Sequence, residues 1–157
     1  MRIVTNSADE TKCLAASLAS VLTPATYIRL EGALGAGKTT FTQGLGRALG
    51  IERAIKSPTY TIIKTYDTPN FPLVHVDAYR LEEGGADTVD LEIYEEEGAV
   101  IMMEWAQFME EALPDSYLQL TFHYQEESNQ RLIVAEIIGE NAAYLALVSR
   151  WMEAFNR

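Results

Sequence analysis

Cysteine is nearly absent from this sequence, since Cys13 is the only one in 157 residues. A single cysteine excludes an intramolecular disulfide and a cysteine-rich metal site. Its surroundings, TKCLAASLA, have apolar residues at helical spacing, so we predict that Cys13 is a small core residue. The fold is expected to depend on a hydrophobic core, which a chain of this length is able to build without disulfides or metals.

Long apolar runs are also missing, and none approaches the ~18 residues of a membrane-spanning helix. The first ten residues, MRIVTNSADE, contain neither an apolar h-region nor a small-residue cleavage site, so no signal peptide is expected. We therefore predict a cytoplasmic protein that makes no contact with a membrane.

Positive charge is scarce. The chain has 12 Lys and Arg against 23 Asp and Glu, which gives a net charge of −11 at pH 7. A domain that binds nucleic acid by itself usually carries a basic patch, so this balance argues against autonomous binding of tRNA or DNA. A basic partner protein remains compatible with it. The densest acidic run, LEIYEEEG at 91–98, fits either such a partner surface or a solvated helix face that aids solubility.

The hydrophobic pattern predicts a single α/β domain over residues 1–157. Its strands and helices alternate first and end in strand pairs, which indicates a three-layer sandwich with central parallel strands and antiparallel edge strands. Ser7 and Glu10 have the spacing of a capping box at the start of the first helix. We expect strands at 2–5, 26–30, 57–67, 71–81, 99–105, 117–124 and 131–138, and helices at 6–22, 38–50, 87–98, 106–114 and 140–155. The strands at 57–67 and 71–81, and those at 117–124 and 131–138, are expected to form antiparallel pairs.

Two glycines lie inside the expected helix at 38–50. Gly44 and Gly46 each lower helix propensity by roughly 1 kcal/mol relative to Ala. Phe41 and Leu45 are spaced to form the buried face of this helix. Close packing of the helix on the sheet would explain why glycines are placed there.

The segment GALGAGKT matches the phosphate-binding motif G-x-x-x-x-G-K-[ST]. An expected strand precedes it and an expected helix follows it, which indicates a P-loop NTPase-like fold. Glycines leave no Cβ between backbone N–H groups and phosphate oxygens, and the helix N-terminus adds partial positive charge. We expect Lys38 to reach the β- and γ-phosphates of ATP or ADP and the Thr39 hydroxyl to ligate Mg²⁺. The predicted nucleotide-binding residues are Gly32, Ala33, Leu34, Gly35, Ala36, Gly37, Lys38, Thr39 and Thr40.

Acidic residues follow two of the apolar strands. Glu104 ends the run VIMMEW, in the position of a Walker-B acid, and is expected to approach Mg²⁺ or to polarise the attacking water. Asp77 follows the apolar strand in HVDAYR and is expected near the same metal or water, with His75 on the same strand face. Trp105 fits either core packing or an aromatic contact in the site. Arg80 supplies charge to the site or pairs with an acidic neighbour.

The segment SPTYT at 57–61 follows the P-loop helix, where P-loop proteins often have a switch. Thr59 is the candidate for following the γ-phosphate and Mg²⁺, with Ser57 as the second choice. A plain strand start after a proline turn explains the same residues equally well.

Taken together, these motifs resemble the TsaE family (also called YjeE), the small bacterial P-loop ATPase of the tRNA threonylcarbamoyladenosine pathway. The resemblance lies in LGAGKTTF, SPTYT, HVDAYRL, YEEEGAVIMMEWA and the LP before the last strand pair, and it spans nearly the whole chain. The glycine-rich motif alone is generic, whereas the ordered set of SPT, DxYRL and EW is specific. Ala33 departs from the pattern, because an acidic residue is common there in the family.

The resemblance implies that Lys38 and Thr39 bind nucleotide phosphates and Mg²⁺, that Asp77 and Glu104 lie at the metal and hydrolysis centre, and that Thr59 belongs to the switch. It also implies two partner proteins, TsaD and its paralogue TsaB. The family is thought to use ATP hydrolysis to reset their complex between rounds of modification without transferring the group itself. By this resemblance, tRNA is reached only through the complex.

Three other functions remain open from the sequence. A small-molecule kinase usually carries an arginine-rich lid, and the arginines here are scattered. A regulatory GTPase usually carries an N/T-K-x-D tetrad, which this sequence does not contain. A nucleotide-gated binding module would have the same phosphate loop but would not need hydrolysis to support its partners.

Overall fold

The computed structural model describes residues 1–55, 62–85 and 89–157. The strands are β1 (Arg2–Thr5), β2 (Tyr27–Gly32), β3 (Ile63–Tyr66), β4 (Leu73–Asp77), β5 (Val100–Glu104), β6 (Tyr117–Tyr124) and β7 (Arg131–Ile138). The α-helices are α1 (Ala8–Ala19), α2 (Lys38–Ala48), α3 (Glu92–Glu96) and α4 (Ala142–Phe155). The 3₁₀ helices are η1 (Tyr79–Glu83), η3 (Ala106–Phe108) and η4 (Glu110–Ala112).

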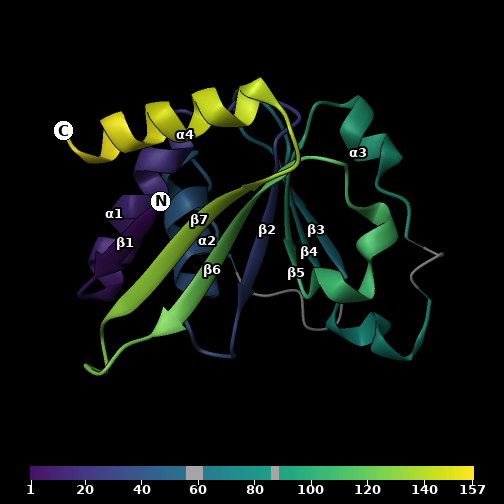
Figure 1. The fold of residues 1–157 in the computed structure, drawn as a ribbon. Helices are drawn as coiled ribbons and strands as arrows, with labels where there is room; N and C mark the ends of the chain where they lie inside the picture. The colour runs from purple at the N-terminus through teal and green to yellow at the C-terminus, as the bar shows by residue number, and fades with distance from the viewer. Residues whose placement is uncertain (56–61, 86–88) are drawn as a thin grey trace.

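Within these residues the strands form one sheet in the order β1-β7-β6-β2-β5-β4-β3 (Figure 1). The neighbouring pairs β6–β2, β2–β5 and β5–β4 are parallel. The pairs at the two sides of the sheet, β1–β7, β7–β6 and β4–β3, are antiparallel. The predicted parallel core with antiparallel edge strands is therefore confirmed.

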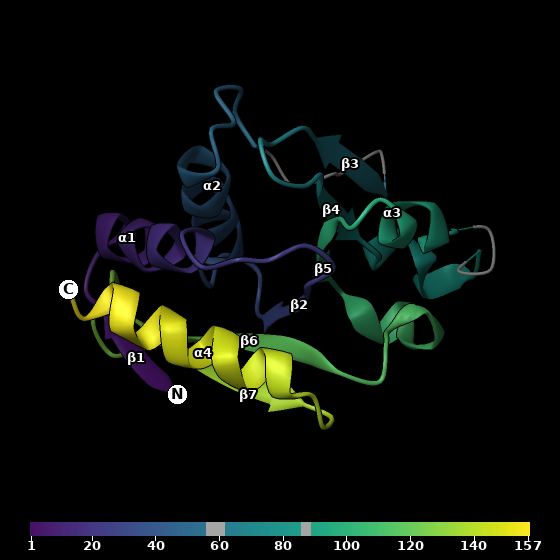
Figure 2. The same ribbon diagram turned by 90° about the horizontal axis from the view of Figure 1, so that it is seen from above.

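The sheet separates two apolar cores, because successive side chains of a strand point to opposite faces. On β2, Ile28 and Leu30 face the core that α1, α2 and α4 cover. Tyr27 faces the other core, to which α3 and the 3₁₀ turns contribute. Figures 1 and 2 show α1, α2 and α4 grouped on one side of the molecule and α3 on the other. The three predicted layers are present, although α3 has only five residues.

Helix α1 begins at the predicted cap. The Ser7 hydroxyl accepts a hydrogen bond from the Glu10 backbone N–H at 3.1 Å. The Glu10 carboxylate accepts from the backbone N–H of Asn6 at 2.7 Å, one residue earlier than in a capping box. Two backbone N–H groups at the helix start are thus satisfied, and such a cap contributes about 1 kcal/mol.

The strand expected at 71–81 is shorter than predicted. It ends at Asp77, and Tyr79–Glu83 form the 3₁₀ helix η1 instead.

Two further local predictions are wrong. Cys13 is exposed rather than buried, because Leu14 and Leu18 occupy the core face of α1 and Cys13 lies beside that face. Residues 106–114 do not form an α-helix, since two 3₁₀ turns, η3 and η4, replace it. Met109 separates the turns with φ −140° and is buried in the second core. Its backbone is not helical, so the two turns do not join into one helix while the apolar side chain points inward.

The glycines of α2 allow close packing, but the neighbour is not the sheet. A Cβ on Gly44 would lie 2.7 Å from the Cα of Lys12 in α1. A Cβ on Gly46 would lie 2.0 Å from Cδ1 of Ile55 in the segment that follows α2. The prediction of close packing is therefore right, and the predicted partner is wrong. Gly44 is the point at which α1 and α2 come nearest to backbone contact.

We expect the substitution Gly44→Ala to lower the free energy of unfolding by about 1–2 kcal/mol. Overpacking costs about 1–3 kcal/mol, and the upper part of this range applies because the new Cβ would meet a backbone atom, the Cα of Lys12. The roughly 1 kcal/mol gain in helix propensity offsets part of this cost. Urea unfolding measures the change. The pair Arg47→Ala and Arg47→Gly, at an exposed position of the same helix, isolates the propensity difference. A Gly44→Ala variant as stable as the native chain would contradict the packing argument.

Candidate nucleotide-binding site

The glycine-rich loop connects β2 to α2 and leaves the start of α2 open. Gly35 and Gly37 have φ of +78° and +112°, which residues with a Cβ rarely adopt. Gly37 is the N-cap of α2 and makes no side-chain hydrogen bond to it. The first backbone N–H groups of this 11-residue helix therefore have no side-chain cap, and together with the helix dipole they favour an anion.

A cavity of about 640 Å³ lies over this loop. Its volume falls within the range of about 300–1,000 Å³ that is typical of small-molecule sites. Its walls come from the phosphate loop, from the ends of β4 and β5, from the start of α1 and from the β6–β7 hairpin. The lining residues are Ala8, Thr11, Leu34, Gly35, Gly37, Lys38, Thr39, Thr40, Asp77, Tyr79, Arg80, Glu104, Trp105, Asn129 and Arg131.

Parallel pairing brings the two predicted acids together. Asp77 and Glu104 are the last residues of β4 and β5, and they are direct partners in the parallel register. Glu104 is also the register partner of Leu30 in β2, two residues before Gly32. The carboxyl ends of three adjacent strands thus meet at the phosphate loop, where open α/β sheets bind their ligands.

Lys38 is buried and has three neighbours. Its Nζ donates a hydrogen bond to the Gly32 carbonyl at 2.7 Å. The same atom lies 3.9 Å from Glu104 Oε1 and 5.0 Å from the centroid of the Trp105 ring, so it has an ionic and a cation–π neighbour. The ammonium is therefore held inside the loop, at the place where the negative charge of a ligand is expected.

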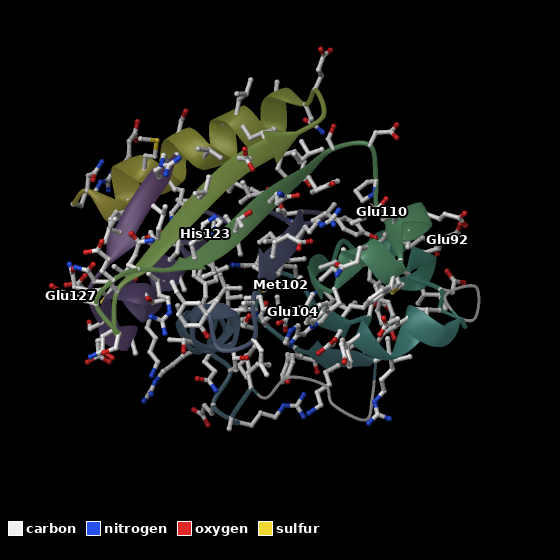
Figure 3. The ribbon with its side chains drawn as sticks, turned by 60° about the horizontal axis from the view of Figure 1, so that its bottom comes forward. Glu92, Met102, Glu104, Glu110, His123 and Glu127 are labelled. Atoms are coloured by element: carbon white, nitrogen blue, oxygen red, sulfur yellow. The ribbon has the colours of Figure 1, made fainter. Side chains whose placement is uncertain are left out.

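Glu104 is 3% exposed and lies deep in the molecule, which Figure 3 shows by contrast with Glu92 and Glu110 at the periphery. Its Oε2 is 2.6 Å from Nε2 of His75, a side chain that is fully buried on β4. A buried carboxylate needs compensating partners, and here His75 lies at one carboxylate oxygen and Lys38 at the other.

Trp105 forms part of the cavity wall, which favours the site contact over plain core packing. Its backbone φ of +57° is unusual for a bulky residue. The ring stacks on Phe108 at 6.3 Å and meets the edge of Tyr79 at 5.0 Å between centroids. These contacts hold the indole beside Lys38, immediately after Glu104.

The residues of the phosphate-binding motif differ in exposure and in whether they line the cavity. Leu34 is 88% exposed at the tip of the loop, and Ala33 is exposed beside it. Ala36 is fully buried and packs inward. Thr39 and Thr40 line the cavity. The predicted switch residue Thr59, and Ser57 with it, lie outside the described residues.

The contribution from the β6–β7 hairpin was not predicted from the sequence. The Tyr124 hydroxyl donates to the Leu34 carbonyl at 2.6 Å, and the Arg131 guanidinium lies 4.7 Å from the centroid of the Tyr124 ring. Arg131 also reaches the Gly35 carbonyl at 3.4 Å. The alternating pattern predicted the two strands, but nothing in it indicates which of their residues meets a loop about 90 positions away. Thr11, buried on α1, was missed for the same reason.

The oxygen donors in the cavity fit Mg²⁺ in the way that nucleotide sites hold it. Asp77, Glu104 and Thr39 all line the same space. Within the described part of the chain, no group of three or more His, Cys, Asp or Glu side chains is arranged to hold a metal alone. Mg²⁺ usually takes one or two carboxylates together with substrate phosphates and waters, so two carboxylates and one hydroxyl suffice.

The sequence profile of the family named "Threonylcarbamoyl adenosine biosynthesis protein TsaE" matches residues 5–133. This chain belongs to the TsaE family. A Bacillus subtilis (strain 168) protein named "tRNA threonylcarbamoyladenosine biosynthesis protein TsaE" is 46% identical over 112 residues, covering 71% of this chain and 70% of its own length. A Nostoc protein of the same name is 37% identical over 145 residues, covering 90% and 87%.

The structural comparison agrees with the TsaE assignment. A crystal structure of YdiB from Bacillus subtilis superposes with a TM-score of 0.83 at 33% identity, covering 98% of this chain and 94% of that one. The resemblance stated from the motifs is therefore confirmed, as is the P-loop NTPase-like fold. Among the described residues, no helix has the length and apolar character needed to cross a bilayer.

Proposed function

We propose that this chain binds ATP with Mg²⁺ and hydrolyses it in support of tRNA threonylcarbamoyladenosine modification. Membership of the TsaE family supports the pathway. The hydrolysis is supported by one observation above all: the phosphate loop, Lys38 and the carboxylates of Asp77 and Glu104 meet in one cavity. A protein that only held ATP with Mg²⁺ would need the loop and one acid for the metal, whereas the second carboxylate here is available for the attacking water.

The roles follow from the positions of the side chains. The N–H groups at the start of α2 and the Lys38 ammonium bind the phosphate chain, the lysine exchanging its bond to the Gly32 carbonyl for phosphate oxygens. Thr39, Asp77 and Glu104 would hold Mg²⁺ directly or through water, and the ion would neutralise charge on the β- and γ-phosphates. Whichever carboxylate does not contact the metal directly accepts a hydrogen bond from the attacking water and orients it.

The acidic surface supports action through partners. With a net charge of −11, the chain has little attraction for tRNA phosphates of its own. We propose that it acts in the cytoplasm on a complex of TsaD and TsaB, which holds the tRNA, and that hydrolysis to ADP resets this complex. The chain is expected to hydrolyse ATP slowly alone and faster with these partners.

The test follows the γ-phosphate. Purified chain is incubated with labelled ATP and Mg²⁺, with and without TsaD, TsaB and tRNA. The proposal expects inorganic phosphate as the labelled product, with a rate that rises when the partners are added. Label recovered on a metabolite instead of phosphate would favour a kinase. Absence of ADP formation during repeated rounds of modification would favour a nucleotide-gated module.

Arg131 is predicted to contribute to nucleotide affinity. Its Nη1 donates to the carbonyls of Ser128 and Gln130 at 2.8 and 2.7 Å, which anchors the guanidinium at the cavity wall. Its buried Nε has no hydrogen-bond partner among the described residues. A charged hydrogen bond contributes about 1.5–3 kcal/mol, so Arg131→Ala is expected to raise the dissociation constant of ATP about tenfold or more. Titration with a fluorescent ATP analogue measures it.

A matched control is available on α4, where Arg150 reaches the Val21 carbonyl at 3.4 Å and does not line the cavity. Arg150→Ala should leave the affinity unchanged. Arg131→Lys should recover little, because an ammonium cannot reproduce the planar set of donors. Native affinity in Arg131→Ala would show that Arg131 serves only the hairpin.

A further inference from the structure

His75 is a fully buried polar residue in the interior of β4, and core packing does not explain it. Its Nε2 lies 2.6 Å from Glu104 Oε2. Its Nδ1 is buried and has no hydrogen-bond partner among the described residues. An unsatisfied buried polar atom costs about 1–3 kcal/mol, whereas an aliphatic side chain at this position would cost nothing of the kind. The bond to Glu104 is therefore the feature that distinguishes histidine here.

The direction of this bond follows from the chemistry of its two atoms. An ionised carboxylate oxygen only accepts hydrogen bonds, so Nε2 of His75 carries the proton and donates it. The parallel register of β4 and β5 fixes the two backbones, because Asp77 pairs directly with Glu104 and His75 pairs with Met102. Both ends of the bond thus rest on buried central strands, which is a rigid base for orienting a side chain.

The bond leaves only one oxygen of Glu104 for the cavity. With Oε2 held by His75, Oε1 is the oxygen that faces Lys38, at 3.9 Å from Nζ. This separation is longer than that of a direct charged hydrogen bond, which is about 2.7–2.9 Å. A carboxylate released from His75 would be free to rotate onto the ammonium and pair closely with it. Lys38 would then be less available for phosphate, and Glu104 less available for metal or water.

We infer that His75 is a positioning residue, whose Nε2–H bond orients Glu104 so that Oε1 faces the phosphate loop without pairing closely with Lys38. The inference rests on the proposed hydrolysis of ATP and assigns a residue to it. His75 acts through Glu104 and does not itself touch the nucleotide. Partners of this kind typically change activity by about 10–100-fold when they are removed.

The test compares His75→Leu, which removes the donor, with His75→Gln, whose side-chain amide N–H is able to donate to the same carboxylate. His75→Leu is expected to lower kcat for phosphate release by about 10–100-fold. The dissociation constant of ATP should rise by a smaller factor, because the released Glu104 carboxylate then competes with phosphate for Lys38. His75→Gln should recover most of kcat. His123, the other histidine of the chain, is exposed on β6 (Figure 3) and supplies the control His123→Gln.

Two measurements separate positioning from a general structural role. In a Glu104→Gln background, His75→Leu should lower kcat little further, because both changes act on one group. NMR of protein labelled with ¹⁵N-histidine should show a protonated Nε2 for His75, and its signal should shift strongly in Glu104→Ala while that of His123 does not. The NMR readout needs neither nucleotide nor metal.

A normal kcat in His75→Leu would overturn the inference. So would an equal fall in kcat when His75→Leu is added to the native chain and to Glu104→Gln, and so would a His75 Nε2 without a proton. A variant that simply unfolds is identified by its thermal transition, and the NMR shift in the native sequence then decides. The failure of the proposed function is a separate result, because the native chain would then release no phosphate from ATP, with or without its partners. If Glu104→Gln hydrolyses ATP at the native rate, Glu104 has no catalytic role and the role assigned to His75 falls with it.

Discussion

Lys38→Met is expected to weaken the binding of ATP by about 100-fold or more, which corresponds to about 2.7 kcal/mol. The methionine keeps most of the volume of a side chain that is 7% exposed, but it removes the only lysine that lines the cavity among the described residues. Phosphate oxygens then lose a charged donor in a place largely closed to water, where such a bond is strongest. Titration with a fluorescent ATP analogue gives the dissociation constant.

Lys38→Met also tests the contact between Lys38 and Glu104 in the site without nucleotide. Removal of the ammonium leaves Glu104 with His75 as its remaining close partner, so thermal unfolding should be measured together with affinity. Lys12→Ala is the matched control, because the exposed Lys12 side chain does not line the cavity, and this variant should bind ATP normally. Native affinity in Lys38→Met would mean that the nucleotide lies elsewhere, and the assignment of the cavity would be wrong.

Glu104→Gln is expected to bind ATP within about threefold of the native chain and to lose about 10²–10⁴-fold in hydrolysis, the usual contribution of a general base. The glutamine has the same shape, and its amide oxygen is able to accept the His75 bond. Only the negative charge is lost. Phosphate release in the presence of TsaD, TsaB and tRNA measures the rate, and calorimetric titration measures the binding.

Repeated rounds of tRNA modification separate the ATPase from a nucleotide-gated module. With Glu104→Gln, the proposal expects about one round per complex and then arrest. A module that needs only bound ATP would continue at the native rate. Glu110→Gln, on the exposed turn η4, is the control and should leave both readouts unchanged.

Much of the fold could be predicted from the sequence, because strands β5, β6 and β7 have clear hydrophobic patterns. The alternating runs at 117–124 and 131–138 form β6 and β7 with the predicted bounds. The run VIMMEW reads as a strand buried on both faces, and all five residues of β5 are buried. Glu104 was predicted as a site residue for the same reason, and the structure places it in the wall of the cavity.

The rest depends on contacts between distant segments, which no local pattern encodes. Arg131 lies 96 residues from the Gly35 carbonyl that it reaches. His75 was noted only as a neighbour of Asp77 on its strand, and its bond to Glu104 comes from the pairing of β4 with β5. Gly44 was predicted to pack on the sheet, whereas it packs on α1, because the sequence does not show that α1 lies against α2. The helix expected at 106–114 failed because burial of Met109 outweighed local propensity.

The walls of the cavity come from residues 8 to 131, so the site exists only when nearly the whole chain is folded. A ligand that binds such a site stabilises the fold as a whole. At a free concentration 100 times its dissociation constant, it adds about 2.7 kcal/mol to the free energy of unfolding. If that ligand is ATP, as proposed, nucleotide supply and the persistence of the folded chain in the cell are thermodynamically linked, independently of any chemistry at the phosphate.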